Sequence, residues 1–314
     1  NRSILFIKSS SYNYKNIFIL DARVHAMTFD SFFLLIRGSN FFYNDKWSVI
    51  IYEDNFHRNG GKKLPYEIYL NNLVNIFLQS LLILPNPPTS IKFVKSSHEL
   101  LRIIKNSKKM FPENYSFLSG DTKHCTMNNF NEKDFQNFKS NQPILKASDY
   151  HSNIFDNFIN YRGIKKYITI TFRNKDWNKD HWNTNLDDIN LYLDFIKKNN
   201  LSDYDILMIP DTQQDISKDI INLIEKNNLK FYIFHHGSFS VPMRFLAYSK
   251  ASFNFSSTNG SASILLLIKN NTFFILKDPN QADDLEVFVK KFNRDIFLDR
   301  NFICIKKLSL KPTP

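Results

Sequence analysis

Short β-prone runs alternate with longer segments of helical spacing through the second half of the chain. The predicted strands cover residues 167–172, 204–209, 230–234, 251–255 and 272–276, and the predicted helices between them cover 186–198, 216–226, 241–248 and 262–269. Apolar residues recur every three or four positions in the helical segments and run nearly unbroken through the strands. This alternation predicts parallel strands joined by crossover helices.

The first half has the same pattern. We expect strands at 4–7, 16–20, 48–52 and 91–94, and helices at 29–36, 66–82 and 96–105. Thr28 is the predicted N-cap of the first helix and Gly38 its predicted break, while Pro85, Pro87 and Pro88 exclude a helix beyond residue 84. Both halves therefore belong to the α/β class.

Residues 106–160 are polar, Asn-rich and weakly periodic. They indicate either a long, partly helical linker or an excursion over a cleft, and residues 149–152 with 155–161 predict a helix that leads into the second half. We place the domain boundary near their end, which gives domains of residues 1–155 and 156–314.

The net charge of +11 would suit nucleic acid, an anionic membrane or an anionic substrate. The basic residues occur mostly as isolated pairs, and no zinc-finger, RRM or KH signature accompanies them, so we expect no nucleic-acid partner. Cys125 and Cys304 lie far apart and form neither a metal motif nor a disulfide framework, which favours a reducing cytoplasm. No stretch approaches about 18 uninterrupted apolar residues, so we expect no membrane-spanning helix.

Polar residues follow the predicted strands of the second half, where parallel strands would bring them to one crevice. Arg173 is the strongest candidate, because a guanidinium can bind a diphosphate through two parallel hydrogen bonds; a surface salt bridge is the alternative. The loop 256–261 with the following helix would suit a phosphate, or would be an ordinary turn. The full candidate set is Arg173, Asn174, Trp177, Asp211, Thr212, His235, His236, Ser257, Thr258, Asn259 and Gly260.

Other members of this set have competing interpretations. Asp211 would accept a hydrogen bond from a ribose or sugar hydroxyl, or would form the N-cap or turn of the helix beginning near residue 216. His235 and His236 would act as acid, base or phosphate donors, or would be structural. No metal-ligand spacing accompanies them. The aspartate pair at 187–188 precedes a predicted helix and the pair at 283–284 starts one, so that complementing the helix dipole explains both pairs without a DxD-type metal site.

In the first half, charged residues and a histidine also follow predicted strands. Asp21, His25 and Asp54 are the candidates for a catalytic base that takes a proton from an acceptor hydroxyl. Surface or helix-capping roles are the alternative for each of them. The other charged residues at these positions are Arg23, Asp30 and Glu53.

Two parts of the sequence resemble a known family. The second half reads YITITFRN…W…DILMIPDTQ…FYIFHHGSF…ASFNFSSTNGSASILLLIKNNTFFILK, and the first half reads FILDARVHAMTFDSFFLLI…WSVIIYEDNFHR with YLNNLVNIFLQSLLILP. They are similar to GT-B-fold glycosyltransferases, and more narrowly to uncharacterised glycosyltransferase-like proteins of bacterial surface-polysaccharide clusters. The resemblance covers most of the chain.

The resemblance implies two Rossmann-like domains facing across a cleft, an acceptor-side first domain and a nucleotide-sugar-binding second domain. It implies no obligatory metal and points to Arg173, Asp211 and residues 257–260 as donor-side positions. The E-x7-E pattern of many retaining members is missing, since residues 259–269 contain no acid. Inverting chemistry is therefore expected.

The leading hypothesis is a metal-independent glycosyltransferase without a cofactor other than its nucleotide-sugar co-substrate. Its acceptor would be a polysaccharide or a lipid-linked glycan. We expect a cytoplasmic protein, with peripheral contact to the anionic inner face of the membrane as a further expectation from its charge. A sugar-nucleotide epimerase of the same fold and a non-catalytic glycan- or nucleotide-binding module are the alternatives.

Overall fold

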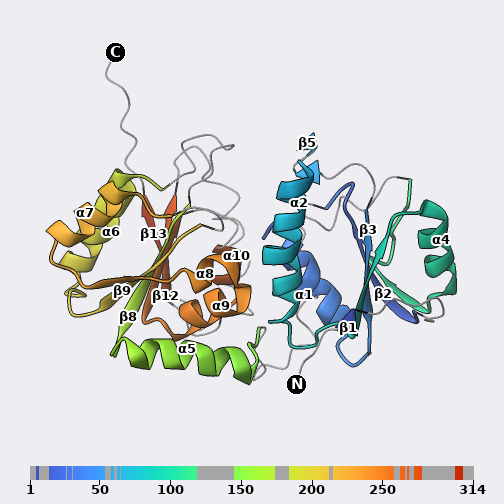
Figure 1. Cartoon of the computed structure of the whole chain (residues 1–314), viewed down its shortest axis with the longest axis horizontal. Coiled ribbons are helices and arrows are strands. Elements are labelled where there is room, and N and C mark those ends of the chain that lie inside the picture. Colours follow the sequence, from blue (N-terminus) through green and yellow to red (C-terminus); the bar gives the residue numbers. More distant parts are fainter. Residues whose placement is uncertain are drawn as a thin grey trace, which may run out of the picture. The chain divides into compact units, whose positions relative to one another are not determined.

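The structure is a computed structural model of the 314-residue chain. It describes residues 5–6, 14–25, 27–29, 31–53, 58–59, 62–63, 65–118, 145–173, 184–211, 215–257, 262–265, 267–268, 272–277 and 301–306. The chain divides into two compact units, Asn1–Ser148 (unit 1) and Asp149–Pro314 (unit 2). Each unit is an α/β structure around a parallel sheet (Figure 1), as the alternation of elements predicts.

The sheet of unit 1 has five parallel strands in the order β1-β6-β3-β2-β7. The strands are β1 (Leu5–Phe6), β2 (Asn16–Asp21), β3 (Ser48–Tyr52), β6 (Ser90–Val94) and β7 (Lys109–Phe111). The helical segments are α1 (Ser31–Phe41), α4 (Ser97–Asn106) and a continuous run of α2 (Tyr66–Asn72), a π-helical stretch (Leu73–Leu78) and α3 (Gln79–Leu81), and a small hairpin pairs β4 (Arg58–Asn59) with β5 (Lys62–Lys63).

Helices cover both faces of the unit 1 sheet (Figure 1). Alternate residues of the strands, among them Ile17, Ile19 and Ile50, pack against Leu100 and Ile103 of α4. On the opposite face α1 lies so close to β2 that a Cβ on Gly38 would come within 2.3 Å of the Phe18 ring. This close approach explains a glycine inside a helix, where it costs backbone entropy.

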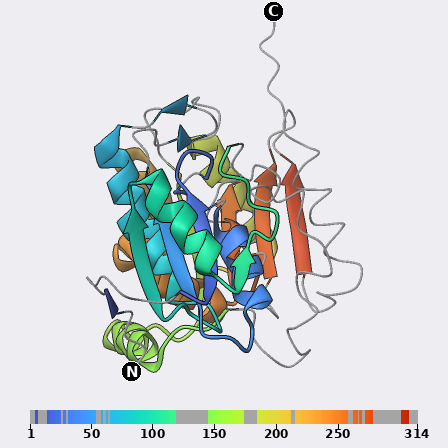
Figure 2. The same ribbon diagram turned by 90° about the vertical axis from the view of Figure 1, so that its right-hand side faces the viewer.

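The sheet of unit 2 has six parallel strands in the order β10-β9-β8-β11-β12-β13. They are β8 (Tyr167–Thr171), β9 (Asp205–Ile209), β10 (Phe231–Ile233), β11 (Phe253–Ser257), β12 (Thr272–Lys277) and β13 (Asn301–Lys306). Counted along the chain, this is the doubly wound order 3-2-1-4-5-6. Figure 2 shows β12 and β13 side by side at one edge of the sheet.

Two groups of helices lie on opposite faces of the unit 2 sheet (Figure 1). α6 (Leu186–Lys198) and α7 (Lys218–Lys226) cover an apolar face, where Ile170 and Met208 pack with Ile189 and Ile224. α9 (Val241–Lys250) packs on the other face, with α5 (Asp149–Tyr161), α8 (His236–Phe239) and α10 (Ala262–Leu265) as the remaining helices described. α6 begins with a capping box between Asn185 and Asp188, which confirms the helix-end explanation of the pair at 187–188.

Several predicted elements differ from the structure. α1 begins at Ser31 and runs through Gly38 to Phe41, so Gly38 is no break and Thr28 is not the N-cap. The stretch 106–160 contains β7, whose three residues are too few for a periodic signal. The helix expected at 262–269 is only the single turn α10 (Ala262–Leu265), and residue 267 lies in a turn. β13 was not predicted.

Candidate functional site

The strand order of a doubly wound sheet defines where a ligand can enter. Two crossovers leave in opposite directions from a pair of central strands, and this opens a crevice at their carboxyl ends. In unit 2 the pair is β8 and β11. In unit 1 the order of β6, β3, β2 and β7 repeats the same pattern, so that its pair is β2 and β7. We call these pairs the switch points of unit 2 and unit 1.

Arg173 lies at the unit 2 switch point, two residues beyond the end of β8. Its side chain is half-buried. Its backbone N–H donates to Thr184 Oγ1 at 2.9 Å, and the Thr184 N–H donates to the Arg173 carbonyl at 2.8 Å. This reciprocal pair joins the two ends of the segment 174–183 and fixes the backbone from which the guanidinium extends.

The neighbouring strand β11 ends at Ser257, and its register pairs Ser256 with Thr171 of β8. Ser257 is therefore one residue and Arg173 two residues beyond a pair of partners on adjacent strands. The structure brings these two predicted residues to one end of one strand pair. The predicted residues Asn174, Trp177, Thr212, Thr258, Asn259 and Gly260 of unit 2 and Asp54 of unit 1 lie outside the described residues.

A hydrogen-bonded row of buried polar side chains leads up to the unit 2 switch point on the face covered by α9. Thr169 Oγ1 donates to Asn254 Oδ1 at 2.5 Å, and Asn254 Nδ2 donates to the Tyr248 carbonyl at 3.1 Å. Two residues further along β8, the Thr171 and Tyr248 hydroxyls lie 2.9 Å apart. Thr169, Thr171, Asn254 and Ser256 are all fully buried, where satisfied polar groups fix a single arrangement.

Asp211 follows β9, the strand next to β8, and is half-buried. The alternative role as a helix cap is excluded, because α7 begins at Lys218 and its N-cap is Ser217, which accepts from the Ile220 N–H. Asp211 is thus a carboxylate at the carboxyl end of the sheet without a capping function in α7.

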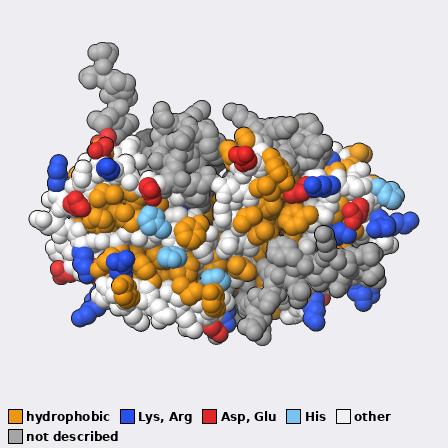
Figure 3. All heavy atoms as spheres, in the orientation of Figure 1, with side chains coloured by type: hydrophobic (Ala, Val, Ile, Leu, Met, Phe, Trp, Pro, Cys, Tyr) orange, Lys and Arg blue, Asp and Glu red, His pale blue; other side chains and the backbone are white. Residues whose placement is uncertain are grey.

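The two histidines follow β10. His235 is exposed, and its Nδ1 lies 3.7 Å from Asp215 Oδ1. His236 begins α8, and its ring lies 5.8 Å from the rings of Phe234 and Phe239. Hydrophobic and histidine side chains gather over α5, α8 and α9 in Figure 3. His236 thus lies beside two aromatic rings, and both histidines are exposed.

At the unit 1 switch point, Asp21, Arg23 and Tyr115 form a hydrogen-bonded cluster. Asp21 ends β2 and is 0% exposed. Arg23 donates to both of its oxygens, with Nη2 at 2.7 Å from Oδ2 and Nε at 3.0 Å from Oδ1. Tyr115, which follows β7, donates its hydroxyl to Asp21 Oδ2 at 2.7 Å. The ends of β2 and β7 are therefore tied together by one carboxylate.

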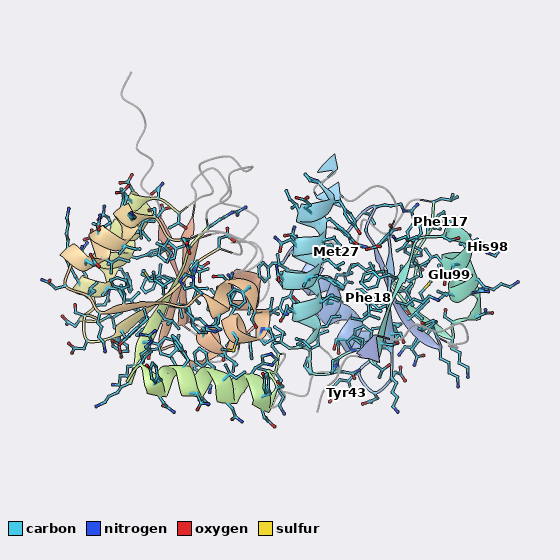
Figure 4. All side chains as sticks on the ribbon, in the orientation of Figure 1. Phe18, Met27, Tyr43, His98, Glu99 and Phe117 are labelled. Atoms are coloured by element: carbon cyan, nitrogen blue, oxygen red, sulfur yellow. The ribbon has the colours of Figure 1, made fainter. Side chains whose placement is uncertain are left out.

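Two aromatic rings enclose the Arg23 guanidinium. Its Cζ lies 4.3 Å from the centre of the Phe117 ring and 5.0 Å from that of Tyr52. Nη2 also donates to the Phe117 carbonyl at 2.7 Å. Figure 4 shows Phe117 at the end of the unit 1 sheet opposite to Tyr43, with Phe18 inside the core. Ion pairing and cation–π contact together hold Arg23 in one position.

This cluster disfavours Asp21 as a catalytic base. Burial alone would raise the pKa of Asp21, but the hydrogen bonds from Arg23 and Tyr115 outweigh it and hold the pKa below its usual value. A buried carboxylate whose two oxygens already accept these bonds is a poor proton acceptor. The Asp21 side chain is instead suited to holding the loop that follows β2.

His25 is 1% exposed, and its Nδ1 accepts a hydrogen bond of 2.9 Å from the Asp21 backbone N–H. The neutral ring therefore carries its proton on Nε2. In this tautomer the ring has no second lone pair with which to take a proton from an acceptor. The geometry favours a positioning role for His25, and its assignment as a base stays a prediction.

Glu53 is a further described carboxylate at this end of the sheet, as is the exposed Glu113 after β7. Glu53 follows β3 and is half-buried, and its Oε1 accepts a hydrogen bond of 2.9 Å from the Tyr69 hydroxyl. Tyr69 lies on α2 and is 1% exposed, and burial and the nearby Glu53 charge raise the pKa of Tyr69. Tyr69 thus stays a hydrogen-bond donor that orients the Glu53 carboxylate. Sequence reasoning did not find this partner, because it lies 16 residues away on a helix.

Within the described ranges, no group of three or more His, Cys, Asp or Glu side chains is arranged to hold a metal ion. Among the same residues, no helix combines the length and the apolar character needed to cross a bilayer.

No protein-family model matches the sequence, and a search of curated proteins gives no match. Among solved structures, the chain is similar to a glycosyl transferase family 9 from Veillonella parvula, with 10% identity, TM-score 0.48 and coverage of 94% of this chain and 87% of that one. It is also similar to E. coli ADP-heptose lps heptosyltransferase II, with 8% identity, TM-score 0.45 and coverage of 92% and 90%. At such scores these likenesses carry no argument about function, which has to rest on the residues of this chain.

Proposed function

We propose that the chain is a glycosyltransferase of GT-B type, whose unit 2 holds a nucleotide-sugar at the β8/β11 switch point. The observation that carries the proposal is the 3-2-1-4-5-6 parallel sheet with Arg173 following its first strand. Doubly wound sheets of this order bind nucleotides at this point. A guanidinium there is suited to a diphosphate, because it can donate two parallel hydrogen bonds to the phosphoryl oxygens.

The proposed reaction is a displacement at the anomeric carbon of the donor sugar. An acceptor hydroxyl oxygen forms the new bond to this carbon while the bond to the diphosphate oxygen breaks, so that the configuration inverts. The electron pair of the broken bond leaves with the nucleoside diphosphate, and Arg173 offsets the developing negative charge. The hydroxyl proton passes to a general base. The acceptor is proposed to be a polysaccharide or a lipid-linked glycan.

We propose Glu53 as this base. Its carboxylate is half-buried and is oriented by Tyr69 at 2.9 Å, whereas the oxygens of Asp21 accept bonds from Arg23 and Tyr115. With the donor identified, Glu53→Gln should lower the rate of sugar transfer about a hundredfold or more. Its affinity for the nucleoside diphosphate should stay that of the wild type. An unchanged rate would remove Glu53 from the mechanism.

The further expectations are proposals as well. The nucleotide-sugar is the co-substrate, and we propose that transfer needs neither a metal nor another cofactor. We also propose a cytoplasmic protein, and its net charge of +11 supports work near an anionic membrane surface. Activity in excess EDTA and co-sedimentation with vesicles of anionic lipid test these two points separately.

Calorimetric titration with ADP, GDP, UDP, CDP and dTDP tests the donor site. We expect one of them to bind and Arg173→Ala to weaken it about thirtyfold, the loss of charge-assisted hydrogen bonds. Arg162→Ala is the matched control, since Arg162 is exposed and precedes the amino end of β8. Absence of binding by all five, or equal loss in both variants, would contradict the proposal.

Incubation with the sugar form of the bound nucleotide separates transfer from the other activities. Release of nucleoside diphosphate that increases with an added glycan acceptor supports a transferase. A changed sugar on an intact nucleotide, without acceptor, would indicate an epimerase. Binding of nucleotide or glycan without any turnover would indicate a binding module.

A further inference from the structure

Arg244 is a buried cation that the sequence patterns did not single out. It lies on α9 within an otherwise apolar run and is 2% exposed. Removing a guanidinium from water is costly unless its donors find partners. A buried guanidinium near the carboxyl ends of β9 and β10 therefore indicates a role that an apolar residue could not perform.

The guanidinium joins two segments that leave neighbouring strands. Nη2 donates to the Pro210 carbonyl at 3.0 Å, directly after β9, and Nε donates to the Gly237 carbonyl at 2.6 Å, in α8 after β10. Ser238 Oγ donates to the same Pro210 carbonyl at 3.2 Å. The Arg244 side chain thus connects α9 to both segments.

Gly237 is needed for this arrangement. A Cβ at this position would lie 2.9 Å from Cδ1 of Phe234 and 3.1 Å from Cγ2 of Ile209. Because the residue has no side chain, its backbone can approach the end of β9 closely enough to present its carbonyl to Arg244. The hydrogen bond from Arg244 to the Gly237 carbonyl therefore depends on both residues.

The tied segments carry donor-side candidates. Asp211 directly follows Pro210, and His235 lies two residues before Gly237. We propose that Arg244 is a positioning residue of the nucleotide-sugar site, which fixes the loops after β9 and β10 through its two carbonyl contacts. This inference rests on the proposed function for its ligand, while the coupling of the two loops does not.

The variant Arg244→Lys tests whether Arg244 acts through the geometry of its guanidinium or only through its positive charge. Lysine keeps the positive charge but lacks the planar fork that reaches both carbonyls. If Arg244 acts by position, Arg244→Lys should weaken the binding of the nucleoside diphosphate about tenfold. Wild-type affinity in Arg244→Lys would overturn the proposal and leave only a charge effect. The exposed Arg162→Lys is the matched control and should bind like the wild type.

Gly237→Ala approaches the same contact from the carbonyl side and keeps Arg244. It should weaken binding by a similar factor, and the double variant should lose no more than either single variant, since both break one contact. Independent, multiplicative losses would contradict a shared contact. This variant also decides the matter if Arg244→Lys does not fold.

Hydrogen exchange tests the loop coupling without any ligand. In Arg244→Lys, amide exchange should rise at least tenfold in residues 234–240, where the Gly237 and Ser238 amides donate locally, and stay unchanged in β11. A uniform rise through unit 2 would mean a general structural role and would overturn the inference. If no nucleoside diphosphate binds the wild type, the proposed function fails while this measurement still decides the role of Arg244.

Discussion

The two switch points share a topology but differ in what their side chains do. In unit 1 the carboxylate at the end of β2 pairs with Arg23 and Tyr115, and the cluster joins β2 to β7. In unit 2 the backbone of Arg173 after β8 is held by Thr184, and a buried polar row runs up to the same strand ends. The comparison teaches that the same strand order can bring different side chains to the strand ends: a carboxylate cluster that joins two strands in unit 1, and an arginine beside a buried polar row in unit 2.

The largest expected effect is on the stability of unit 1. Asp21→Asn removes the fully buried negative member of a pair whose Arg23 side chain is 20% exposed, and leaves Arg23 between two rings. We expect it to lower the free energy of unfolding by about 3 kcal/mol, measured by urea denaturation at pH 7.

Asp45→Asn is the matched control for this change, because the Lys109–Asp45 pair has a comparable distance of 2.9 Å but both side chains are 40% exposed. It should cost less than about 1 kcal/mol. Equal costs for the two variants would mean that the cluster at β2 and β7 is no more than a surface ion pair.

The second effect compares the two arginines directly. Arg173→Ala should reduce the affinity for the nucleoside diphosphate by about 2 kcal/mol, the value of charge-assisted hydrogen bonds, with a small change in stability. Arg23→Ala should do the reverse, destabilising unit 1 while the folded protein keeps its affinity. Calorimetric titration and urea denaturation of both variants measure this. If Arg23→Ala abolished binding in a folded protein, the assignment of the two switch points would be wrong.

The smallest effect concerns Tyr115. Tyr115→Phe removes one hydrogen bond to the Asp21 carboxylate and should cost about 1.5 kcal/mol at pH 7. Because the folded-state pKa of Asp21 lies below its unfolded value, the ionised cluster stabilises unit 1 above about pH 4, and this contribution is lost as the pH falls through the folded pKa.

The stability difference between wild type and Tyr115→Phe should therefore shrink on acidification. Urea denaturation at pH 7 and pH 3 compares them. A difference that stays constant even where the Asp21 carboxylate is protonated in the folded state would show that the hydroxyl contributes packing and not a bond to the ionised carboxylate.

The sequence allowed the fold class to be predicted because its signals are local. Helix α6 runs over the residues that its period indicates, Leu186–Lys198, and β3 does so over Ser48–Tyr52. β7 escaped prediction because three residues carry no period, although it completes the unit 1 switch point. Gly38 was misread because the reason for it, the Phe18 ring on another element, is tertiary.

Sequence reasoning could place candidate residues after strands, but it could not give their partners. Asp21 and Arg23 are near neighbours, yet the Tyr115 hydroxyl that completes their cluster comes from 94 residues away. Tyr69 and Arg244 act through contacts with segments that approach them only in the fold. The strand order, which selects Arg173 over other charged strand ends, is likewise fixed by pairing between distant segments.

The central claim is that a nucleotide occupies the switch point of unit 2 and not that of unit 1. Hydrogen-exchange mass spectrometry with and without the bound nucleoside diphosphate tests it most directly. We predict protection in residues 167–173 and 253–257, with residues 16–25 and 109–118 unchanged. Protection confined to the Asp21–Arg23 cluster and its surroundings would contradict the account.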